Sequence, residues 1–440
     1  MHLNAHLDVD VVALESDDSI TVMLELQAPA APETGTPRPE HTAVVVLDRS
    51  GSMARSRLDH AKRALVDLVD RLDDRDRFGL VTFDRESEVV VPAGKVGDRG
   101  RDRIRRDIAS IRSRGMTDLS SGYFRGLQEA RRVCTAAGAT VVLLSDGHAN
   151  AGVTDAEALA AAAQNAARQS VSTSTVGIGT GYDETILAAL ASGGSGNHAF
   201  AEHADAAAAA VAGELDGLLS KTAQAASLLI EPTSDVARVA LLNEGLPAQR
   251  VEGGVLAELG DFYAGETRTV TVTIDVPAMA ALGLAQVATL TVRYVELATL
   301  AEHTMTVPVS VNVVPADVAA GRVPNPVVEQ EKLLQQTQVD KRRAEEALRS
   351  GDHHRARESM RRAQQRLRSA SADVASDEIA SELAWLEESE QALRSRDADY
   401  SRKRMSSDRW RKSRGYKSRP QGGEVTRDPS DGSSGSTDVA

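Results

Sequence analysis

The sequence has little of what a disulfide-bonded or membrane-spanning protein needs. It contains one cysteine, Cys134, so no internal disulfide bond can form. No apolar run reaches the length of a membrane-spanning helix, and the N-terminal residues alternate like a strand instead of forming a charged and then apolar leader. These absences predict a cytoplasmic protein without a transmembrane segment. The excess of arginine over lysine and the abundant alanine favour a bacterial source.

Positive charge is also in short supply. The 51 lysines and arginines are outnumbered by 64 aspartates and glutamates, which gives a formal net charge of −13. This charge argues against a general affinity of the protein body for nucleic acid. A chain of 440 residues is long enough for two or three domains with sizeable cores, so the length predicts a multidomain protein.

Two separated segments alternate apolar and polar residues with the period of a β-strand. Residues 1–28 contain two such runs joined by a polar turn at 16–19. Residues 225–314 show the same pattern, most clearly over 270–276, which is typical of an antiparallel sandwich with one solvated face. A lone hairpin is marginal in water, so we expect residues 1–28 to join this sandwich.

Strands alternate with helices between these two segments, over residues 40–222. The strand candidates are apolar runs at 43–48, 78–83, 87–92, 139–145, 171–177 and 197–201. Apolar residues at helical spacing separate them. This order predicts a doubly wound, mostly parallel, Rossmann-like α/β domain that is inserted into an all-β sandwich.

The C-terminal part of the chain is helical and then basic. Residues 327–398 show helical spacing and are expected to form an extension that serves assembly. Residues 400–440 begin with a basic stretch and end in a Gly/Ser-rich tail that is predicted to be disordered. Because aromatic residues interleave with the basic ones from Arg402 to Arg419, this stretch is a candidate for binding nucleic acid or an anionic surface. Pairing with the acidic body of the chain and a solvated tail are the alternatives.

The residues that carry chemistry follow two of the predicted strands. The first strand of the α/β domain ends on Asp48, and Ser50 and Ser52 follow at alternate positions. Asp146 follows the fourth strand, and Thr117 opens the helix before that strand. Because neighbouring strand ends converge in a doubly wound sheet, these oxygen donors are expected to meet at one edge. Hard oxygen ligands of this kind suit Mg²⁺.

This D-x-S-x-S…T…D pattern resembles the metal-ion-dependent adhesion site (MIDAS) of von Willebrand factor A (VWA) domains, here of the bacterial intracellular type. The resemblance implies Mg²⁺ as the ion, with Mn²⁺ or Ca²⁺ as alternatives. It implies three hydroxyls that bind the ion directly and two carboxylates that act through water, namely Ser50, Ser52, Thr117, Asp48 and Asp146. Neutral direct ligands leave the ion under-neutralised with one open position, which an Asp or Glu of a partner protein can fill.

Three neighbours of these ligands are candidates for a partner-binding rim: Arg49, Asp118 and His148. A plainer interpretation exists for the first part of the pattern alone. A strand that ends in Asp48, followed by Ser50 and a glycine, is also typical of a turn whose side chains cap the next helix. The matching residues after the later strands favour the metal site over this turn.

Two enzyme classes share parts of the pattern but lack its chemistry. A haloacid-dehalogenase-type phosphatase needs a second aspartate two residues after the first, where this chain has Ser50. A subtilisin-like protease needs a catalytic histidine and serine, but His60 lies within a predicted helix and no nucleophile motif follows. The sequence therefore predicts a non-enzymatic, metal-dependent protein-binding module, a scaffold in a multiprotein assembly. The alternative is a nucleic-acid or membrane-surface adaptor that acts through the basic stretch.

Overall fold

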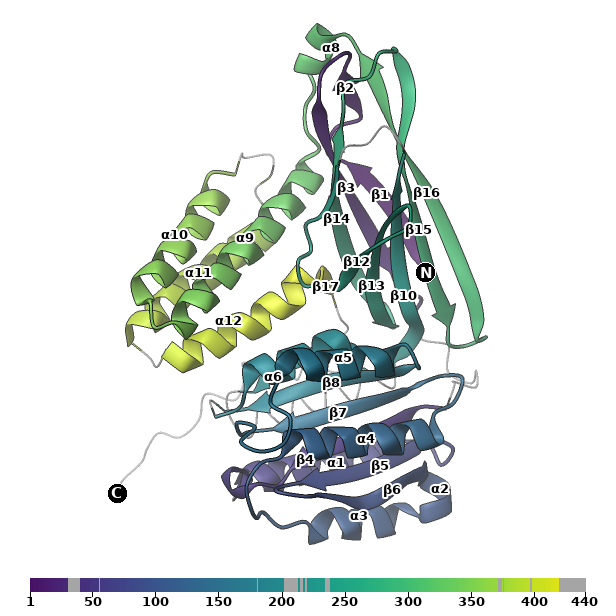
Figure 1. Cartoon of the computed structure of the whole chain (residues 1–440), viewed down its shortest axis with the longest axis vertical. Helices are drawn as coiled ribbons and strands as arrows, with labels where there is room; N and C mark the ends of the chain where they lie inside the picture. The colour runs from purple at the N-terminus through teal and green to yellow at the C-terminus, as the bar shows by residue number, and fades with distance from the viewer. Residues whose placement is uncertain are drawn as a thin grey trace, which may run out of the picture.

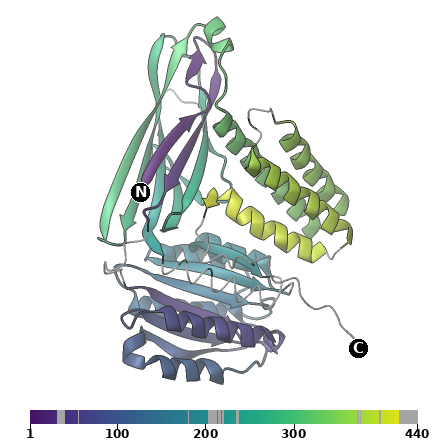
Figure 2. The ribbon, with the colours of Figure 1, turned by 180° about the vertical axis from the view of Figure 1, so that it is seen from behind.

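The chain folds into three units that contact one another (Figure 1). An α/β domain lies at one end, a β-sandwich lies at the other, and a helical region packs beside both, as the reverse view also shows (Figure 2). This computed structural model describes residues 1–30, 40–54, 56–179, 181–201, 213, 217, 220–233, 238–370, 374, 376–395 and 398–418.

The α/β domain is built on one sheet with the strand order β6-β5-β4-β7-β8-β9. All neighbouring strands are parallel except β5 and β6, which form an antiparallel edge. The strands are β4 (Thr42–Asp48), β5 (Arg77–Phe83), β6 (Ser87–Lys95), β7 (Ala139–Ser145), β8 (Val171–Ile178) and β9 (Ser195–Ala201). Every residue of β4, β7 and β8 is buried, as expected for parallel strands that are covered on both faces.

Helices provide that cover on both faces of the sheet. Alternate residues of β4 show the two layers: Val45 packs against the side of α1 and α3, whereas Val44 and Val46 pack against the side of α4, α5 and α6. The helices of this domain are η1 (Gly51–Met53), α1 (Ser56–Arg71), α2 (Val96–Arg99), α3 (Arg101–Ser110), α4 (Leu119–Val133), α5 (Ala156–Ala167) and α6 (Glu184–Gly193). Because helices cover both faces of the sheet, ligands or other parts of the chain can approach it at the two edges where its strands begin and end.

The β-sandwich consists of two sheets around one apolar core. The first has the order β1-β3-β14-β11, and β17 also pairs with β14; the second has the order β12-β13-β10-β15-β16-β2. The strands of the first sheet are β1 (His2–Leu7), β3 (Asp18–Gln27), β14 (Thr267–Val276), β11 (Arg238–Leu241) and β17 (Tyr416–Ser418). Those of the second are β12 (Ala248–Val251), β13 (Gly254–Tyr263), β10 (Lys221–Pro232), β15 (Gly283–Glu296), β16 (Ala301–Val314) and β2 (Val11–Ala13).

The N-terminal strands lie within these two sheets. β3 pairs with β14 along its whole length, from Asp18–Val276 to Gln27–Thr267, and β2 runs parallel to the end of β16. The α/β domain comes between β3 and β10 in the chain, so the polypeptide leaves the sandwich, forms the α/β domain and returns.

The helical region extends beyond its predicted end at residue 398. Its helices are α8 (Ala316–Ala320), α9 (Pro326–Arg349), α10 (His353–Arg368), α11 (Asp377–Ser395) and α12 (Ala398–Ser413). The basic stretch therefore forms α12 and β17 instead of beginning a tail. The Gly/Ser-rich end of the chain, predicted to be disordered, lies outside the described residues. None of the helices that the structure describes is long and apolar enough to cross a membrane.

Candidate metal centre

The carboxyl ends of β4 and β7 bring two aspartates together at one edge of the sheet. The strands are parallel neighbours, in register up to the pair Leu47–Leu144. Asp48 ends β4 and Asp146 follows β7, so both carboxylates emerge at the same edge. Both residues are almost fully buried, with 0% and 1% of their surface exposed. Such burial is costly for a carboxylate unless another group compensates its charge.

Asp48 is held by hydrogen bonds, and no described lysine or arginine pairs with it. Its Oδ1 accepts the backbone N–H of Ser50 at 2.8 Å, and its Oδ2 accepts the hydroxyl of Ser145 at 2.7 Å. Burial raises the pKa of Asp48 to about 6, although these hydrogen bonds favour the charged form. A bound cation would therefore compensate a charge that the surrounding residues leave unbalanced.

Ser50 and Ser52 link Asp48 to Asp146. Their hydroxyl oxygens lie 2.9 Å apart, and the Ser52 hydroxyl donates to Asp146 Oδ1 at 2.6 Å. The second carboxylate oxygen of Asp146 is 2.6 Å from Nη1 of Arg57, which lies in the first turn of α1. The Arg57 side chain is 39% exposed, so solvent screens its charge on Asp146 in part.

Thr117 reaches the same place from the loop before α4. Asn150 fixes this loop, because its Oδ1 accepts the Thr117 backbone N–H at 3.1 Å and its own N–H donates to the Thr117 carbonyl at 3.2 Å. Gly147 marks the space that the donors share. A β-carbon at this position would lie 3.4 Å from the hydroxyl oxygens of both Ser52 and Thr117, and 3.8 Å from Asp48 Oδ2. The predicted ligands therefore converge on one small space.

The chemistry of this donor set fits a small hard cation. All the predicted donors are oxygens, from two carboxylates and three hydroxyls. Within the part of the chain that the structure describes, no group of three or more His, Cys, Asp or Glu side chains is placed to hold a metal, so a site here depends on the serine and threonine hydroxyls. Mg²⁺ accepts such a set because it binds few carboxylates and keeps several waters. Metals that prefer nitrogen or sulfur find no suitable ligand among these donors.

Three further residues shape the site although no motif marks them: Arg57, Ser145 and Asn150. Ser145 is a polar residue at the end of a buried apolar strand, and this position could have marked it in the sequence as a functional residue. Arg57 follows Ser52 by five residues, so its contact with the Asp146 carboxylate depends on how β7 lies beside β4. Asn150 acts through a contact between two loops that only the folded chain creates.

The predicted rim residues have different environments. His148 follows Gly147 in the chain; 65% of its side chain is exposed, and its Nδ1 lies 4.0 Å from Asp183 Oδ2. Asp118 is the N-cap of α4, so its carboxylate serves the helix. The prediction for Arg49 needs correction, because its side chain is buried and pairs with Asp84 at 2.8 Å and with Glu88 at 2.7 Å. Arg49 ties β4 to the β5–β6 edge and does not face a partner.

The basic stretch of α12 and β17 also needs a new interpretation. Lys403 is 1% exposed, and its ammonium lies 3.3 Å from the Glu184 carboxylate and 3.8 Å from the centre of the Tyr182 ring. Lys412 pairs with Asp408 at 2.8 Å. Most cations of α12 are therefore engaged with carboxylates of the same chain, which removes support from binding to nucleic acid or an anionic surface. The helix escaped prediction because it buries paired charges and lacks a continuous apolar stripe.

Comparison with known proteins identifies the α/β domain. Residues 43–212 match the family model of the von Willebrand factor type A domain, so the chain contains a VWA domain, as predicted. An uncharacterised protein of Synechocystis is 28% identical over 159 residues, which cover 36% of this chain and 37% of that protein. Human inter-alpha-trypsin inhibitor heavy chain H4 is 28% identical over 165 residues, which cover 35% of this chain and 17% of that protein. The chain therefore matches less than two fifths of the length of each of these relatives.

Solved structures resemble the whole chain and not only its VWA domain. A von Willebrand factor type A protein from Catenulispora acidiphila aligns with a TM-score of 0.73 at 15% identity, over 94% of this chain and 97% of that one. The ArnB paralog VWA2 from Sulfolobus acidocaldarius aligns with a TM-score of 0.61 at 13% identity, over 94% and 99%. At these identities the likeness shows a shared fold.

Proposed function

We propose that the chain is a non-enzymatic, metal-dependent binding module whose VWA domain captures an acidic residue of a partner protein. The observation that carries this proposal is the convergence of hydroxyl and carboxylate oxygens on the space beside Gly147, at the carboxyl edge of the sheet. Ligands bind preferentially at this edge in doubly wound sheets. The sandwich and the helical region add surfaces that suit a scaffold in a multiprotein assembly.

The ligand residues divide into two groups in this proposal. Ser50, Ser52 and Thr117 would hold the ion through neutral oxygens. Asp48 and Asp146 would hold it through water. When bound, Mg²⁺ supplies a positive centre whose charge is incompletely neutralised and which keeps an exchangeable position. A carboxylate from a partner is the group that best completes both the charge and the coordination.

The surroundings of this edge suit a protein partner. Met116, next to Thr117 in the chain, is 51% exposed, and Val153 is 40% exposed. Val153 lies against the start of α4, where its backbone N–H donates to the hydroxyl of Ser120 at 2.9 Å. Exposed apolar side chains beside a polar centre are typical of recognition surfaces. His148, which follows Gly147 in the chain, adds an exposed imidazole.

Thr117→Ala tests this function. Thr117 contributes one hydroxyl to the proposed site and is fixed through its backbone, so its loss should abolish partner capture while the fold remains. Thr154→Ala is the matched control, because Thr154 is exposed and lies in the same region without a described role in the site. The measurement is a pull-down from the native host in Mg²⁺ and in excess EDTA. Recovery of the same partners in EDTA would defeat the proposal.

The partner offers a second test. Its essential residue should be an exposed Asp or Glu, and conversion to Asn or Gln should prevent capture, because an amide offers an oxygen without the charge. The proposal also includes a bacterial cytoplasmic setting, supported by one unpaired cysteine and the Arg- and Ala-rich composition. Fractionation of the native host with an antibody against the chain tests that location.

A further inference from the structure

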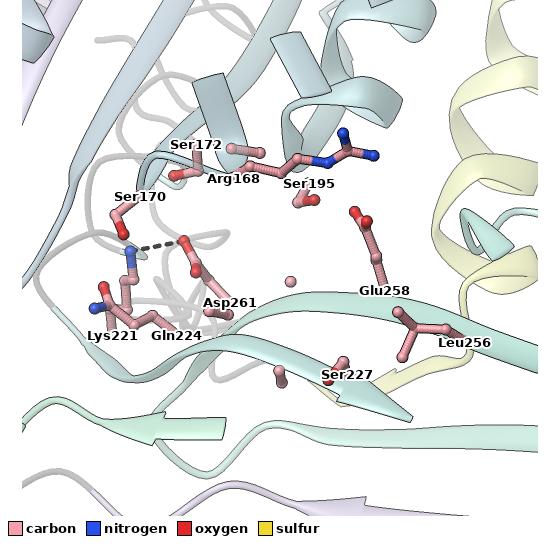
Figure 3. Close-up of a pocket in the computed structure, with 14 residues that line it drawn as sticks. Arg168, Ser170, Ser172, Ser195, Lys221, Gln224, Ser227, Leu256, Glu258 and Asp261 are labelled. Carbon is pink, nitrogen blue, oxygen red and sulfur yellow. Dashed lines mark ion pairs between the residues drawn. The ribbon is translucent and has the colours of Figure 1, made fainter. Parts of the chain in front are cut away.

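A pocket lies between the VWA domain and the sandwich, far from the metal centre. Its volume is about 210 Å³. The VWA domain contributes the end of α5 and the residues that open β8 and β9, which are the amino ends of parallel strands; the sandwich contributes β10 and β13 (Figure 3). The metal centre lies at the carboxyl ends of the same sheet, so the two sites face opposite ways. Domain junctions of this kind are frequent locations of ligand sites.

The backbone around this pocket is strained. Of the five non-glycine residues with positive φ among those that the structure describes, three line the pocket: Ser170 (φ 61°), Ser195 (φ 54°) and Ala225 (φ 52°). Gly260 (φ 75°) lines it as well, and a β-carbon there would come within 2.7 Å of the Ser195 carbonyl oxygen. Strained backbone concentrates at ligand clamps, so its presence here calls for a function.

One end of the pocket is closed by a charge pair that needs no ligand. Lys221 Nζ lies 2.7 Å from Asp261 Oδ2, and the two side chains are 6% and 12% exposed. Figure 3 shows this pair on one side of the cavity, with Ser195 and Glu258 on the other side. Because Lys221 and Asp261 neutralise each other, recognition must come from the remaining side chains.

Two of those side chains are charged and form no direct ion pair with a described residue, although the Glu258 carboxylate also acts electrostatically on the buried guanidinium of Arg414. Arg168, at the end of α5, and Glu258, on β13, both line the pocket, and neither forms an ion pair or side-chain hydrogen bond with another described residue. The hydroxyls of Ser195 and Ser227 line it as well. The pocket therefore offers one cation from the VWA domain, one anion from the sandwich, and hydroxyls that can donate or accept.

We propose that this pocket binds a small zwitterion of the free α-amino acid class, with its carboxylate on Arg168 and its ammonium on Glu258. A simple anion would meet repulsion from Glu258, and a simple cation would meet repulsion from Arg168. Charge-assisted hydrogen bonds to both groups favour a ligand that carries both charges. The bound ligand bridges the two domains and stiffens their junction.

Calorimetric titration of the full chain tests this site with glycine and L-serine as probes. Glycolate and ethylamine are the matched controls, because each keeps one of the two charges. We expect glycine or L-serine to bind at least about tenfold more tightly than either control, equally in Mg²⁺ and in EDTA. Absence of binding by both amino acids at millimolar concentration would overturn the proposal, as would glycolate or ethylamine binding as well as they do.

Substitutions then locate the binding. Arg168→Gln and Glu258→Gln should each weaken probe binding by at least about tenfold. The control variants Arg106→Gln and Glu252→Gln carry the same changes at exposed positions outside the pocket and should leave binding unchanged.

Exchanging the two charges gives the most stringent test of this binding site. The single variants Arg168→Glu and Glu258→Arg should abolish binding, whereas the double variant restores one charge of each sign and should recover it. Far-UV circular dichroism shows that each variant is folded. Unchanged binding in both glutamine variants, or failure of the folded double variant to recover it, would refute the assignment.

Discussion

Two regions of this chain bury carboxylates, and they compensate the charge in opposite ways. At the candidate metal centre, Asp48 is surrounded by hydrogen-bond donors and no described residue supplies it with a paired cation, and burial raises its pKa to about 6. In the helical region, Glu382 is also buried and Asp408 is partly buried, which alone would raise their pKa values. The ammonium groups of Lys341 and Lys412 nevertheless hold both pKa values below the usual range.

The difference separates a structural cluster from a candidate binding site. Glu382 and Asp408 pair with lysines of the same chain, so this cluster joins α9, α11 and α12 and needs no bound cation. Asp48 keeps an uncompensated charge at a sheet edge where four other oxygen donors gather. A perturbed pKa together with such convergence is typical of functional sites, whereas paired burial is typical of structural networks.

Loss of metal binding is the largest expected effect. Asp48→Ala should weaken Mn²⁺ binding by at least about 100-fold, because it removes the carboxylate that orders the site. Asp408→Ala removes a partly buried carboxylate from the helical region and should leave Mn²⁺ affinity unchanged. Calorimetric titration of Mn²⁺ into both variants and the wild type makes the comparison. Equal affinity of Asp48→Ala and the wild type would exclude this location for the metal.

The second effect concerns the helical region. Lys341→Met leaves the Glu382 and Asp408 carboxylates without their nearest ammonium and should destabilise this region by about 3–5 kcal/mol. Trp385 and Trp410, the two tryptophans of the chain, both lie in this region, so tryptophan fluorescence during urea unfolding reports on it directly. Lys95→Met, at a 42% exposed side chain, is the control. A change below about 1 kcal/mol in Lys341→Met would show that the network contributes no net stability.

Much of the fold could be predicted because burial leaves a pattern in the sequence. The apolar runs at 43–48 and 139–145 correspond to β4 and β7 within a residue at each end, since parallel strands covered on both faces are apolar throughout. The VWA domain followed from the residues after these strands. α12 was missed because its buried residues are serines and Lys403 beside only two large apolar side chains, Met405 and Trp410. Its charge pairs involve Glu184, Glu345 and Glu382, which lie far away in the sequence.

In the candidate site, too, some features follow from local sequence patterns and others depend on the packing of distant segments. The five predicted ligands come together because each lies at the end of a recognisable element. The contact between Arg57 and Asp146, and the support of Thr117 by Asn150, depend on the packing of loops that no local pattern specifies. Arg49 was misplaced for a related reason, since sequence position beside Asp48 does not reveal on which side of the strand end its side chain lies.

The third effect depends on pH. The folded pKa of Asp48, about 6, lies above its ordinary value of 3.8. The associated stability is complete below pH 3.8 and is lost as pH rises through 6, so the metal-free protein is destabilised by about 3 kcal/mol near pH 8. Asp48→Asn lacks this charge and should be more stable than the wild type near pH 8 in EDTA, by up to that amount.

Thermal unfolding followed by far-UV circular dichroism checks this expectation. The advantage of Asp48→Asn should disappear in acid, where the wild-type carboxyl is protonated, and should shrink when Mg²⁺ is added to the wild type. Ser145→Ala removes a hydrogen bond to the same carboxylate without removing its charge, so it should not stabilise the protein near pH 8. Asp48→Asn that is less stable than the wild type near pH 8 in EDTA would show that the charge of Asp48 is already compensated.

The smallest expected effect concerns an arginine that pairs with a predicted ligand at the candidate metal centre. Arg57 is the cation that occupies one oxygen of Asp146 at 2.6 Å, and a bound metal must share that carboxylate with it. Arg57→Gln removes the competing positive charge, so Mn²⁺ affinity should rise by about three- to tenfold, and the gain should shrink at high salt because the side chain is 39% exposed. Arg63→Gln, further along α1, is the control for a general change in charge. Weaker Mn²⁺ binding by Arg57→Gln, with Arg63→Gln unchanged, would mean that Arg57 orients Asp146 for the ion and does not compete with it.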